Sequence, residues 1–488
     1  MGIATTEYDV TNGAWAYAKH RIYISNGNKA GSTAGAGASS YGASWTTGDI
    51  IGVAVDMDAP SLTFYKNNAT QGVSHTDLAG KTWVPLIENF DTGTQVFHTN
   101  FGQDGTFAGE KTAQGNADGN GYGNFYYAPP SSHLALCTKN LEDCAVIPSK
   151  HFNTILYTGD GSSENAITGV GFQPDFLWQK RRNGSGWHFT TDVFREPLGM
   201  STSENHADQS NANFTSLDAD GFTVGTPGNF GGLNTNGATA VAWCWKAGGA
   251  GSANTDGDMA ETVTVSANQN AGFSIVKYTG DGSAATVGHG LSAAPELIIV
   301  KNTDQADAWQ VYHAGNTSAP ETDYMVLNTD AATSDAADRW NDTAPTSSVF
   351  TIGDAVEVNT DDENYIAYCF HSVDGFSKIG AYEGNGNADG PFCFTSFSPS
   401  YVILKKISAA ANWRSHTSGN RTPPDINGVG ARIEFTTGTE TTSTSAYDID
   451  FLSNGFKLRT NSTYPNASGA DFIYIAFAKT PFKNANAR

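Results

Sequence analysis

Near its start the chain alternates apolar and polar residues in two short stretches separated by a turn. The stretches are residues 50–56 (IIGVAVD) and 61–68 (SLTFYKNN), and residues 57–60 (MDAP) connect them. Alternation with a period of two is typical of a half-buried β-strand, because successive side chains of a strand point to opposite faces. Two such stretches joined by a short connection predict a β-hairpin.

Four landmarks recur in register in three later segments of the chain. Each segment starts with a tyrosine that precedes a Gly-Asp-Gly or Gly-Asn-Gly turn. A proline follows at position +17, a lysine at +23 and a tryptophan at +30 or +31. The landmarks are Tyr157, Pro174, Lys180 and Trp187; then Tyr278, Pro295, Lys301 and Trp309; then Tyr382, Pro399, Lys405 and Trp413. This regularity predicts three internal repeats with a period of roughly 100–120 residues.

Each repeat contains an apolar run between the proline and the lysine and closes on a second one. The closing runs are residues 240–245 (AVAWCW), 365–370 (YIAYCF) and 474–478 (YIAFA). We align Cys244 and Cys369 with Ala478. A position that accepts both cysteine and alanine is a small packing position, not a disulfide or a catalytic thiol.

Glycine-containing turns separate the predicted strands of each repeat. The Gly-Asp-Gly and Gly-Asn-Gly sequences fit hairpin turns, since Gly and Asn tolerate positive φ. Asp220-Gly221 and Asn454-Gly455 predict a second shared turn before a strand. Units of this size with many short strands are expected to be antiparallel β-sandwiches or jelly rolls.

These patterns predict an all-β, multidomain protein, because 488 residues are too many for one core. We expect a first domain at 1–107, a Gly/Asn/Pro-rich connection at 108–150, and repeats at 151–249, 250–381 and 382–488. The abundance of glycine and the low share of charged residues suit short strands joined by turns.

The net charge of −22 is concentrated in the second repeat. Residues 250–381 carry 4 basic and 19 acidic side chains, whereas residues 382–488 carry 10 basic and 8 acidic ones. Such a negative field disfavours polyanions, so nucleic acid is not an expected partner. Solvated charge is the simplest interpretation of the acidic stretch, although Asp330, Asp335, Asp338 and Asp342 leave open a Ca²⁺ site with oxygen ligands.

The cysteine pattern and the apolar runs exclude several classes. None of the five cysteines forms a CxxC pair, which argues against structural zinc. Cys137 and Cys144 can either close a short loop or stay free thiols. No apolar run approaches the ~20 residues of a membrane span, so membrane insertion is not expected.

The first domain resembles the SPRY domain, a concanavalin-like β-sandwich. The phrase GDIIGVAVDMDAPSLTFYKN (48–67), followed by WVPLI (83–87) and NFGQ (100–103), carries the resemblance. SPRY domains normally have further strands before the GIA segment, so the domain is expected to be N-terminally incomplete or to borrow a strand. The resemblance implies binding of peptides or glycans through loops, with Trp15, Tyr17, Tyr41 and Trp45 as surface candidates. Packing of at least half of these aromatics into the core is the alternative.

The combination with the later repeats resembles proteins of marine bacteriophages. GVGFQPDFLWQK (169–180) and ATAVAWCWKAGG (238–249) carry this likeness. It implies a virion or extracellular location and partners among virion proteins or host-surface glycans. It also favours a homo-oligomer.

Enzyme signatures are absent from the sequence. It contains no GxSxG, HExxH, Walker A or GxGxxG motif, and its histidines lack metal-ligand spacing. Carboxylate pairs for glycoside hydrolysis need no short motif. Nominal candidates are Asp192 with Glu196, and Asp361, Asp362 and Glu363, but neither set recurs in the other repeats.

Polar residues beside the shared tryptophan give the candidate glycan-binding sites. An aromatic face flanked by hydrogen-bonding groups is how lectins hold sugars, and a core landmark in each sandwich is the alternative. The candidates are Trp187, His188, Asp192, Arg195, Trp309, His313, Trp413, Arg414 and His416.

The sequence therefore predicts a non-enzymatic structural or adhesive protein of a phage virion, as a tail fibre or capsid-surface component. A secreted bacterial glycan-binding lectin and a polysaccharide depolymerase are the alternatives.

Overall fold

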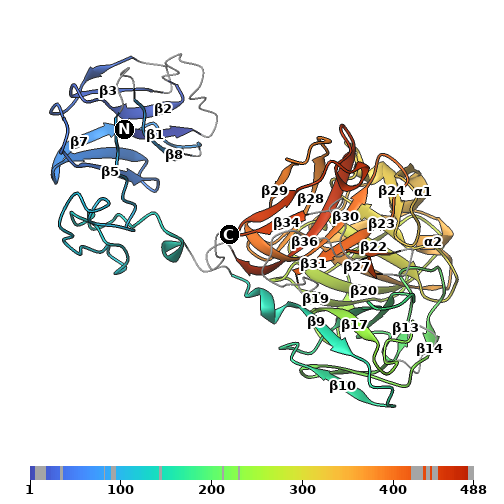
Figure 1. Cartoon of the computed structure of the whole chain (residues 1–488). Coiled ribbons are helices and arrows are strands. Elements are labelled where there is room, and N and C mark those ends of the chain that lie inside the picture. Colours follow the sequence, from blue (N-terminus) through green and yellow to red (C-terminus); the bar gives the residue numbers. More distant parts are fainter. Residues whose placement is uncertain are drawn as a thin grey trace. The chain divides into compact units, whose positions relative to one another are not determined.

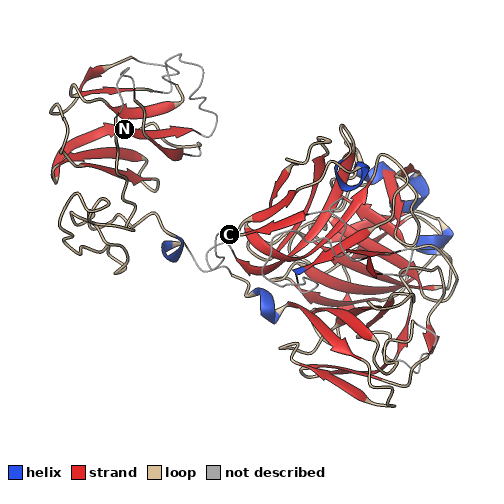
Figure 2. Cartoon of the chain, viewed as in Figure 1, coloured by secondary structure: helices blue, strands red, loops and turns tan. Residues whose placement is uncertain are grey.

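The computed structural model describes residues 1–5, 18–32, 37–81, 83–89, 95–141, 145–210, 214–228, 231–418, 432–435, 440–441 and 449–481. The chain forms two compact units, Met1–Glu142 and Asp143–Arg488. The regular structure of the described residues is nearly all antiparallel β-sheet (Figure 2), which confirms the predicted class. The helices are short: α1 (Ala337–Trp340), α2 (Val356–Asn359), α3 (Thr463–Asn466), η1 (Thr138–Asn140), η2 (Pro148–Lys150) and η3 (Pro320–Thr322).

The first unit contains two sheets with a small core between them. Their strand orders are β4-β3-β2-β1-β8 and β5-β6-β7. The strands are β1 (Gly2–Thr5), β2 (His20–Tyr23), β3 (Asn28–Ala30), β4 (Ser39–Ser40), β5 (Ile51–Asp56), β6 (Ser61–Lys66), β7 (Ala69–His75) and β8 (Trp83–Leu86). The pairing of β5 with β6 confirms the predicted hairpin. Ile3, Tyr23, Leu62, Phe64 and Leu78 form the core between the two sheets.

The segment expected to be an exposed connection contains an ordered turn structure around Asp118. The carboxylate accepts hydrogen bonds from the backbone N–H groups of Asn120 (2.9 Å), Tyr122 (2.9 Å) and Ala135 (2.8 Å) and from Asn140 Nδ2 (2.7 Å). Burial alone would raise the pKa of Asp118, but these hydrogen bonds lower it to about 2. The described part of 108–141 therefore belongs to the first unit, and the predicted boundary at 107 lies inside that unit.

Acidification is expected to loosen this turn structure. The pKa of Asp118 is lower in the folded chain than the ~4 of an unfolded aspartate, so its contribution to stability is present above pH ~4 and is lost as pH falls toward 2. Amide hydrogen exchange of residues 118–141 in the whole chain, corrected for its intrinsic pH dependence, should accelerate over that range. Asp118→Asn should show fast exchange at neutral pH already. Equal exchange in the two proteins at pH 7 would contradict this role for Asp118.

The second unit is built from three β-sandwiches that follow one another along the chain (Figure 1). The larger sheet contains the order β12-β11-β17-β9 in the first repeat and β23-β22-β27-β20 in the second. In the third repeat the order is β31-β30-β36-β28. The smaller sheets are β10-β16-β15, β21-β26 and β29-β35-β34. The predicted sandwich repeats are therefore present.

The strand bounds of the three repeats are as follows. The first contains β9 (Phe152–Thr158), β10 (Asn165–Thr168), β11 (Phe176–Arg181), β12 (Phe189–Asp192), β13 (Leu198–Gly199), β14 (Gln209–Ser210), β15 (Phe214–Asp218), β16 (Gly221–Val224) and β17 (Thr239–Trp245). The second contains β18 (Ser252–Asn254), β19 (Val263–Asn268), β20 (Phe273–Thr279), β21 (Ala285–Gly288), β22 (Leu297–Asn302), β23 (Gln310–His313), β24 (Asp323–Val326), β25 (Ser334–Asp335), β26 (Val349–Ile352) and β27 (Asn364–Phe370). The third contains β28 (Ser377–Glu383), β29 (Phe392–Phe394), β30 (Phe397–Lys406), β31 (Arg414–Thr417), β32 (Arg432–Glu434), β33 (Glu440–Thr441), β34 (Ile449–Leu452), β35 (Gly455–Leu458) and β36 (Asp471–Pro481).

The three sandwiches share one central core. One face of each larger sheet packs inside its own sandwich, and the opposite face contributes to a single hydrophobic cluster. Trp243 from the first repeat, Trp309 from the second and Trp413 from the third belong to this cluster. The repeats are therefore parts of one folding unit and not separate domains, as the division of the chain into two units also indicates.

The Gly-Asp-Gly and Gly-Asn-Gly turns connect the two sheets of a sandwich instead of forming hairpins. β9 pairs with β17, whereas the next strand, β10, pairs with β16. A fully buried asparagine holds each turn by accepting the backbone N–H that follows its first glycine. The pairs are Asn234 with Asp160 (3.1 Å), Asn359 with Asp281 (2.9 Å) and Asn466 with Asn385 (2.8 Å). Sequence analysis did not identify this asparagine, which precedes the first residue of each closing strand by five positions.

The observed strand register corrects the alignment of the two cysteines with Ala478. Leu177 pairs with Cys244, Ile298 with Cys369 and Val402 with Ala476, so Ala476 occupies the cysteine position and Ala478 does not. The position is buried and its cysteines are free, which confirms the packing role. The boundary predicted after residue 381 falls inside β28, because that strand starts before the landmark tyrosine. Cys144 lies outside the described residues, and Cys137 is a free cysteine.

Candidate binding pocket

The strand register shows which residues are equivalent in the three repeats. Phe176 pairs with Asp192, Leu297 with His313 and Tyr401 with Thr417, so Asp192, His313 and Thr417 occupy one position. The residues four positions before these are also equivalent to one another, and they are His188, Trp309 and Trp413. Trp187, which was aligned with the other two tryptophans, is therefore one residue out of register.

The residues at the tryptophan position point into the shared core. Trp309 Nε1 donates to the carbonyl oxygen of Ser201 (2.9 Å) in the first repeat, and Trp413 Nε1 donates to that of Val326 (3.0 Å) in the second. His188 accepts a hydrogen bond from Trp178 Nε1 (2.9 Å) and packs against Phe435 of the third repeat. Each repeat thus uses this position to contact another repeat.

These residues cannot form a solvent-facing glycan platform. Trp309, Trp413 and His188 are at most 1% exposed, so no sugar ring can stack on them. Burial lowers the pKa of His188 well below its usual range, which keeps its ring neutral in the core. The alternative that the shared tryptophan is a core residue is confirmed for Trp309 and Trp413. The prediction of a glycan platform is wrong for Trp309, Trp413 and His188. Trp187 is half-buried and packs on His206.

The position of Asp192, His313 and Thr417 joins the repeats by polar contacts. Tyr368 Oη donates to Asp192 Oδ2 (2.7 Å), and His313 Nε2 donates to the Tyr474 carbonyl oxygen (3.3 Å). Trp243 Nε1 donates to Thr417 Oγ1 (3.3 Å). These bonds connect the first repeat to the second, the second to the third, and the third to the first, so the contacts form a closed ring.

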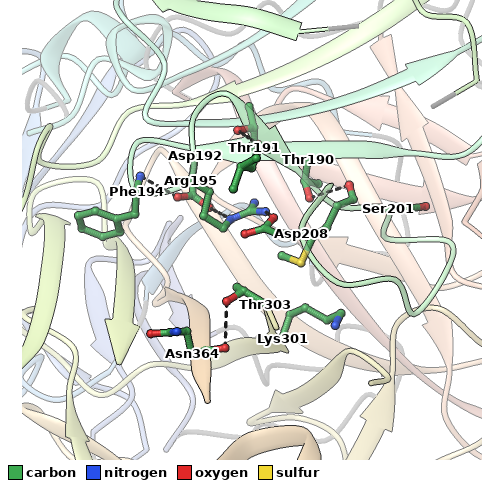
Figure 3. A network of polar contacts seen from close by, with 12 residues as sticks. Thr190, Thr191, Asp192, Phe194, Arg195, Ser201, Asp208, Lys301, Thr303 and Asn364 are labelled. Carbon is green, nitrogen blue, oxygen red and sulfur yellow. Dashed lines mark hydrogen bonds and ion pairs between the residues drawn. The ribbon is translucent and has the colours of Figure 1, made fainter. Parts of the chain in front are cut away.

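Arg195 is the centre of a buried ion network between the first two repeats (Figure 3). Its guanidinium donates to Asp192 Oδ2 (2.6 Å), Asp208 Oδ1 (2.7 Å) and Tyr368 Oη (2.8 Å). Burial alone would lower the pKa of Arg195, but the Asp192 carboxylate, Tyr368 and Asp208 raise it well above its ordinary value. Burial raises the pKa of Asp208, although Arg195 opposes that shift. Asp192 and Arg195 therefore act as an interface clamp and do not face solvent.

The remaining candidates also have structural contacts. Arg414 pairs with Glu434 (2.9 Å) and lies over the Tyr464 ring, and His416 is buried. Tyr41 and Trp45 pack partly buried against the core of the first unit, whereas Trp15 and Tyr17 lie outside the described residues.

The nominal acidic sites likewise have other contacts. Glu196 accepts the Leu217 N–H (2.8 Å), and Glu363 accepts a hydrogen bond from Asn302 Nδ2 (2.6 Å). No group of three or more His, Cys, Asp or Glu side chains able to hold a metal ion occurs in the described part of the chain, the acidic stretch of the second repeat included.

The position of Arg195 has a different residue in the second repeat. Asn316 follows His313 by three residues, as Arg195 follows Asp192, and both backbones make the same turn: Arg195 N–H donates to the Asp192 carbonyl (3.0 Å) and Asn316 N–H to that of His313 (2.9 Å). The partners also correspond. Asp208 N–H donates to the Thr303 carbonyl (2.8 Å), and Thr333 N–H donates to the equivalent Ile407 carbonyl (3.2 Å). Asn316 and Thr333 thus stand where the first interface has Arg195 and Asp208.

A pocket of about 550 Å³ lies beside Asn316, between the second and third repeats. Its size falls within the range of small-molecule sites, roughly 300–1,000 Å³. Ala381, Tyr382 and Ile407 supply apolar surface. The other lining residues carry polar groups or are glycine: Gly315, Asn316, Thr317, Ser318, Thr333, Glu383, Ser408 and Asp471.

One buried donor in this pocket has no partner among the described residues. Asn316 is 2% exposed, and its Oδ1 accepts a hydrogen bond from Thr333 Oγ1 (2.6 Å). Its Nδ2 makes no hydrogen bond. A buried amide donor left unpaired costs about 1–3 kcal/mol, so an acceptor from a ligand would stabilise it.

Sequence analysis missed this pocket, although one signal for it exists. Arg195 and Asn316 both follow the landmark tyrosine of their repeats by 38 residues, so a long cation in one repeat is replaced by a short amide in the next. The side chains that complete the pocket come from the third repeat, and no local pattern specifies that packing.

Comparisons with known families agree with this division of the chain. The family model described as "Domain of unknown function (DUF7483)" matches residues 147–481, which covers all three repeats. The SPRY domain model matches residues 1–104. No curated protein matches the chain. Among the described residues, no helix is long and apolar enough to cross a membrane.

Proposed function

The chain belongs to the DUF7483 family, and from its pocket we propose that it is a non-catalytic protein that binds glycans at the repeat 2–3 interface. The unpaired Asn316 amide carries this proposal, because it is a buried donor on a residue that lines a pocket of mixed apolar and polar surface. Sugars present alternating hydroxyl groups and apolar C–H faces, and such a lining is complementary to both.

The setting we propose is the surface of a phage virion, as a tail-fibre or capsid-surface component. Hydrogen bonds connect the three repeats in a closed ring. This arrangement supports the proposal, because it would hold a binding pocket in a rigid frame. The SPRY domain supplies a second binding module, since domains of this kind generally bind partners. A secreted lectin would use the same pocket, and the position of the gene among capsid or tail genes would distinguish the two settings.

A polysaccharide depolymerase is the second candidate, because Glu383 and Asp471 line the same pocket. Two carboxyl groups across a sugar are the usual machinery of glycoside hydrolysis. A general acid needs a carboxyl group that apolar surroundings keep protonated, and both residues are exposed. This exposure favours binding over hydrolysis. Release of reducing ends from bound polysaccharide would instead support the enzyme.

Asn316→Arg is the direct test of the pocket. It introduces at this position the residue that the chain already uses at the equivalent position of the first repeat, so the larger side chain should fill the pocket while the turn is retained. On a glycan array, binding by the whole protein should fall at least about tenfold, which corresponds to ~1.4 kcal/mol. Asn270→Arg is the matched control, because it adds the same charge at an exposed position outside the pocket. Equal glycan binding by both variants, or no binding by the wild type, would refute the proposed site.

A further inference from the structure

The pocket between the second and third repeats contains two acids and no base. Glu383 lies at the end of β28 and Asp471 at the start of β36. Within the described part of the chain, neither carboxylate has an ion-pair or side-chain hydrogen-bond partner. No lysine, arginine or histidine lines the pocket.

The buried landmark lysine of the third repeat, Lys405, makes its hydrogen bonds outside the pocket lining. Lys405 Nζ donates to the carbonyl oxygens of Asp330 (3.1 Å) and Ala331 (2.7 Å), which fixes the loop that carries Thr333. Burial lowers the pKa of Lys405 to about 8, and its side chain is not part of the pocket lining. The second repeat, which forms one wall, carries 4 basic and 19 acidic residues. The charge of the pocket lining itself is negative, because, among the described residues that line it, Glu383 and Asp471 are the only ionisable ones other than Tyr382.

The hydrogen-bonding groups specify what a ligand must present. Carboxylates only accept hydrogen bonds, so Glu383 and Asp471 require donors on the ligand. The free Nδ2 of Asn316 requires an acceptor. A neutral sugar satisfies both through its hydroxyl groups, but an ammonium group adds charge-assisted hydrogen bonds to the carboxylates, whereas a uronic acid would be repelled.

We propose that this pocket selects sugars that carry a free, protonated amino group, such as the hexosamine units of a deacetylated polysaccharide. This selectivity rests on the proposed glycan-binding function and specifies its ligand class. Asn316 fixes a ring hydroxyl or ether oxygen, and Glu383 and Asp471 hold the ammonium group.

Matched methyl glycosides test the proposal by titration against the whole protein. For each of the gluco, galacto and manno series, the hexosamine, N-acetylhexosamine, hexose and hexuronic acid are compared at about 20 mM and 500 mM salt. In at least one series the hexosamine should bind roughly tenfold more tightly than the hexose, and high salt should reduce that difference severalfold. The hexuronic acid should bind most weakly of the four.

The carboxylate variants separate charge recognition from general binding. Glu383→Gln and Asp471→Asn should each reduce hexosamine affinity about three- to tenfold and reduce hexose affinity less, because the amide oxygen still accepts a hydroxyl hydrogen bond but no longer carries charge. Asn316→Arg should remove binding of both. Equal hexosamine and hexose affinities, or uronic acid as the tightest ligand, would overturn the amino-sugar inference and leave the glycan pocket standing. No binding of any sugar would overturn both proposals.

Discussion

Replacing Trp309 with alanine is expected to lower the free energy of unfolding of the unit Asp143–Arg488 by about 3–5 kcal/mol. The side chain is fully buried in the core that all three repeats share. Its removal therefore leaves a cavity lined by strands of several repeats, which cannot shift far enough to fill it. The substitution also leaves the Ser201 carbonyl without the indole donor. Urea unfolding followed by circular dichroism measures the loss.

Trp187→Ala is the matched control, because the same residue type is removed from a half-buried position. Its expected cost is below about 2 kcal/mol, since only part of the side chain leaves an apolar environment. The shared core also predicts that Trp309→Ala shifts the unfolding of the first and third repeats along with the second. An early transition confined to the second repeat, with the others unchanged, would show that the repeats fold independently.

The repeats could be predicted from the sequence because their landmarks have local roles. Positive φ is required at the last glycine of each turn, as at Gly161 and Gly282. The landmark lysines are buried and donate to loop carbonyls, as Lys301 does to the nearby Gln305 carbonyl (2.9 Å). Such requirements constrain a residue by its own surroundings, so they recur at fixed spacing wherever the turn or loop recurs.

The sequence also contains a signal for the shared core. The strands FLW (176–178), LIIV (297–300) and AVAWCW (240–245) are continuously apolar instead of alternating. A continuous apolar run is typical of a strand buried on both faces, whereas a sandwich strand with one solvated face alternates. The three larger sheets have both faces buried, which a set of separate sandwiches would not require.

The pocket and the ion network could not be predicted, because both depend on contacts between repeats. Asp192 and Tyr368 lie 176 residues apart in the chain, and nothing local to either residue indicates the other. The polar neighbours of the shared tryptophan were interpreted as a ligand site because the sequence does not show that another repeat contacts them. Histidine and aspartate on a strand indicate a face exposed to solvent. Here another repeat covers that face, and no local pattern indicates such a contact.

Replacing Arg195 with asparagine is expected to cost about 3–5 kcal/mol at pH 7.5, because it leaves the buried Asp192 carboxylate and the partly buried Asp208 carboxylate without their counter-ion. The substitution places in the first repeat the residue that stands at the equivalent position of the second. Asparagine is too short to bridge Asp208 and Tyr368 as the guanidinium does. Denaturant unfolding of the whole protein measures the effect.

The pH dependence of that loss identifies its cause. Without Arg195, burial raises the pKa of Asp208 further in the folded state, so the folded state binds protons that the unfolded state releases. A carboxyl group whose pKa is raised on folding destabilises the fold as pH rises through that pKa. The variant should therefore recover part of its deficit relative to the wild type when pH is lowered from 7.5 to about 5. A deficit that stays constant or grows on acidification would exclude the unpaired carboxylates as its source.

A second substitution distinguishes the lost charge from lost packing. Arg195→Asn combined with Asp208→Thr reproduces the Asn316–Thr333 pair of the next interface, where Thr333 Oγ1 donates to Asn316 Oδ1. Removing one of the two unpaired carboxylates should restore about 1–2 kcal/mol relative to the single variant. If the double variant is as unstable as the single one, packing of the guanidinium and not its charge holds the first two repeats together. If it recovers as expected, the unpaired Asp208 carboxylate accounts for that part of the loss.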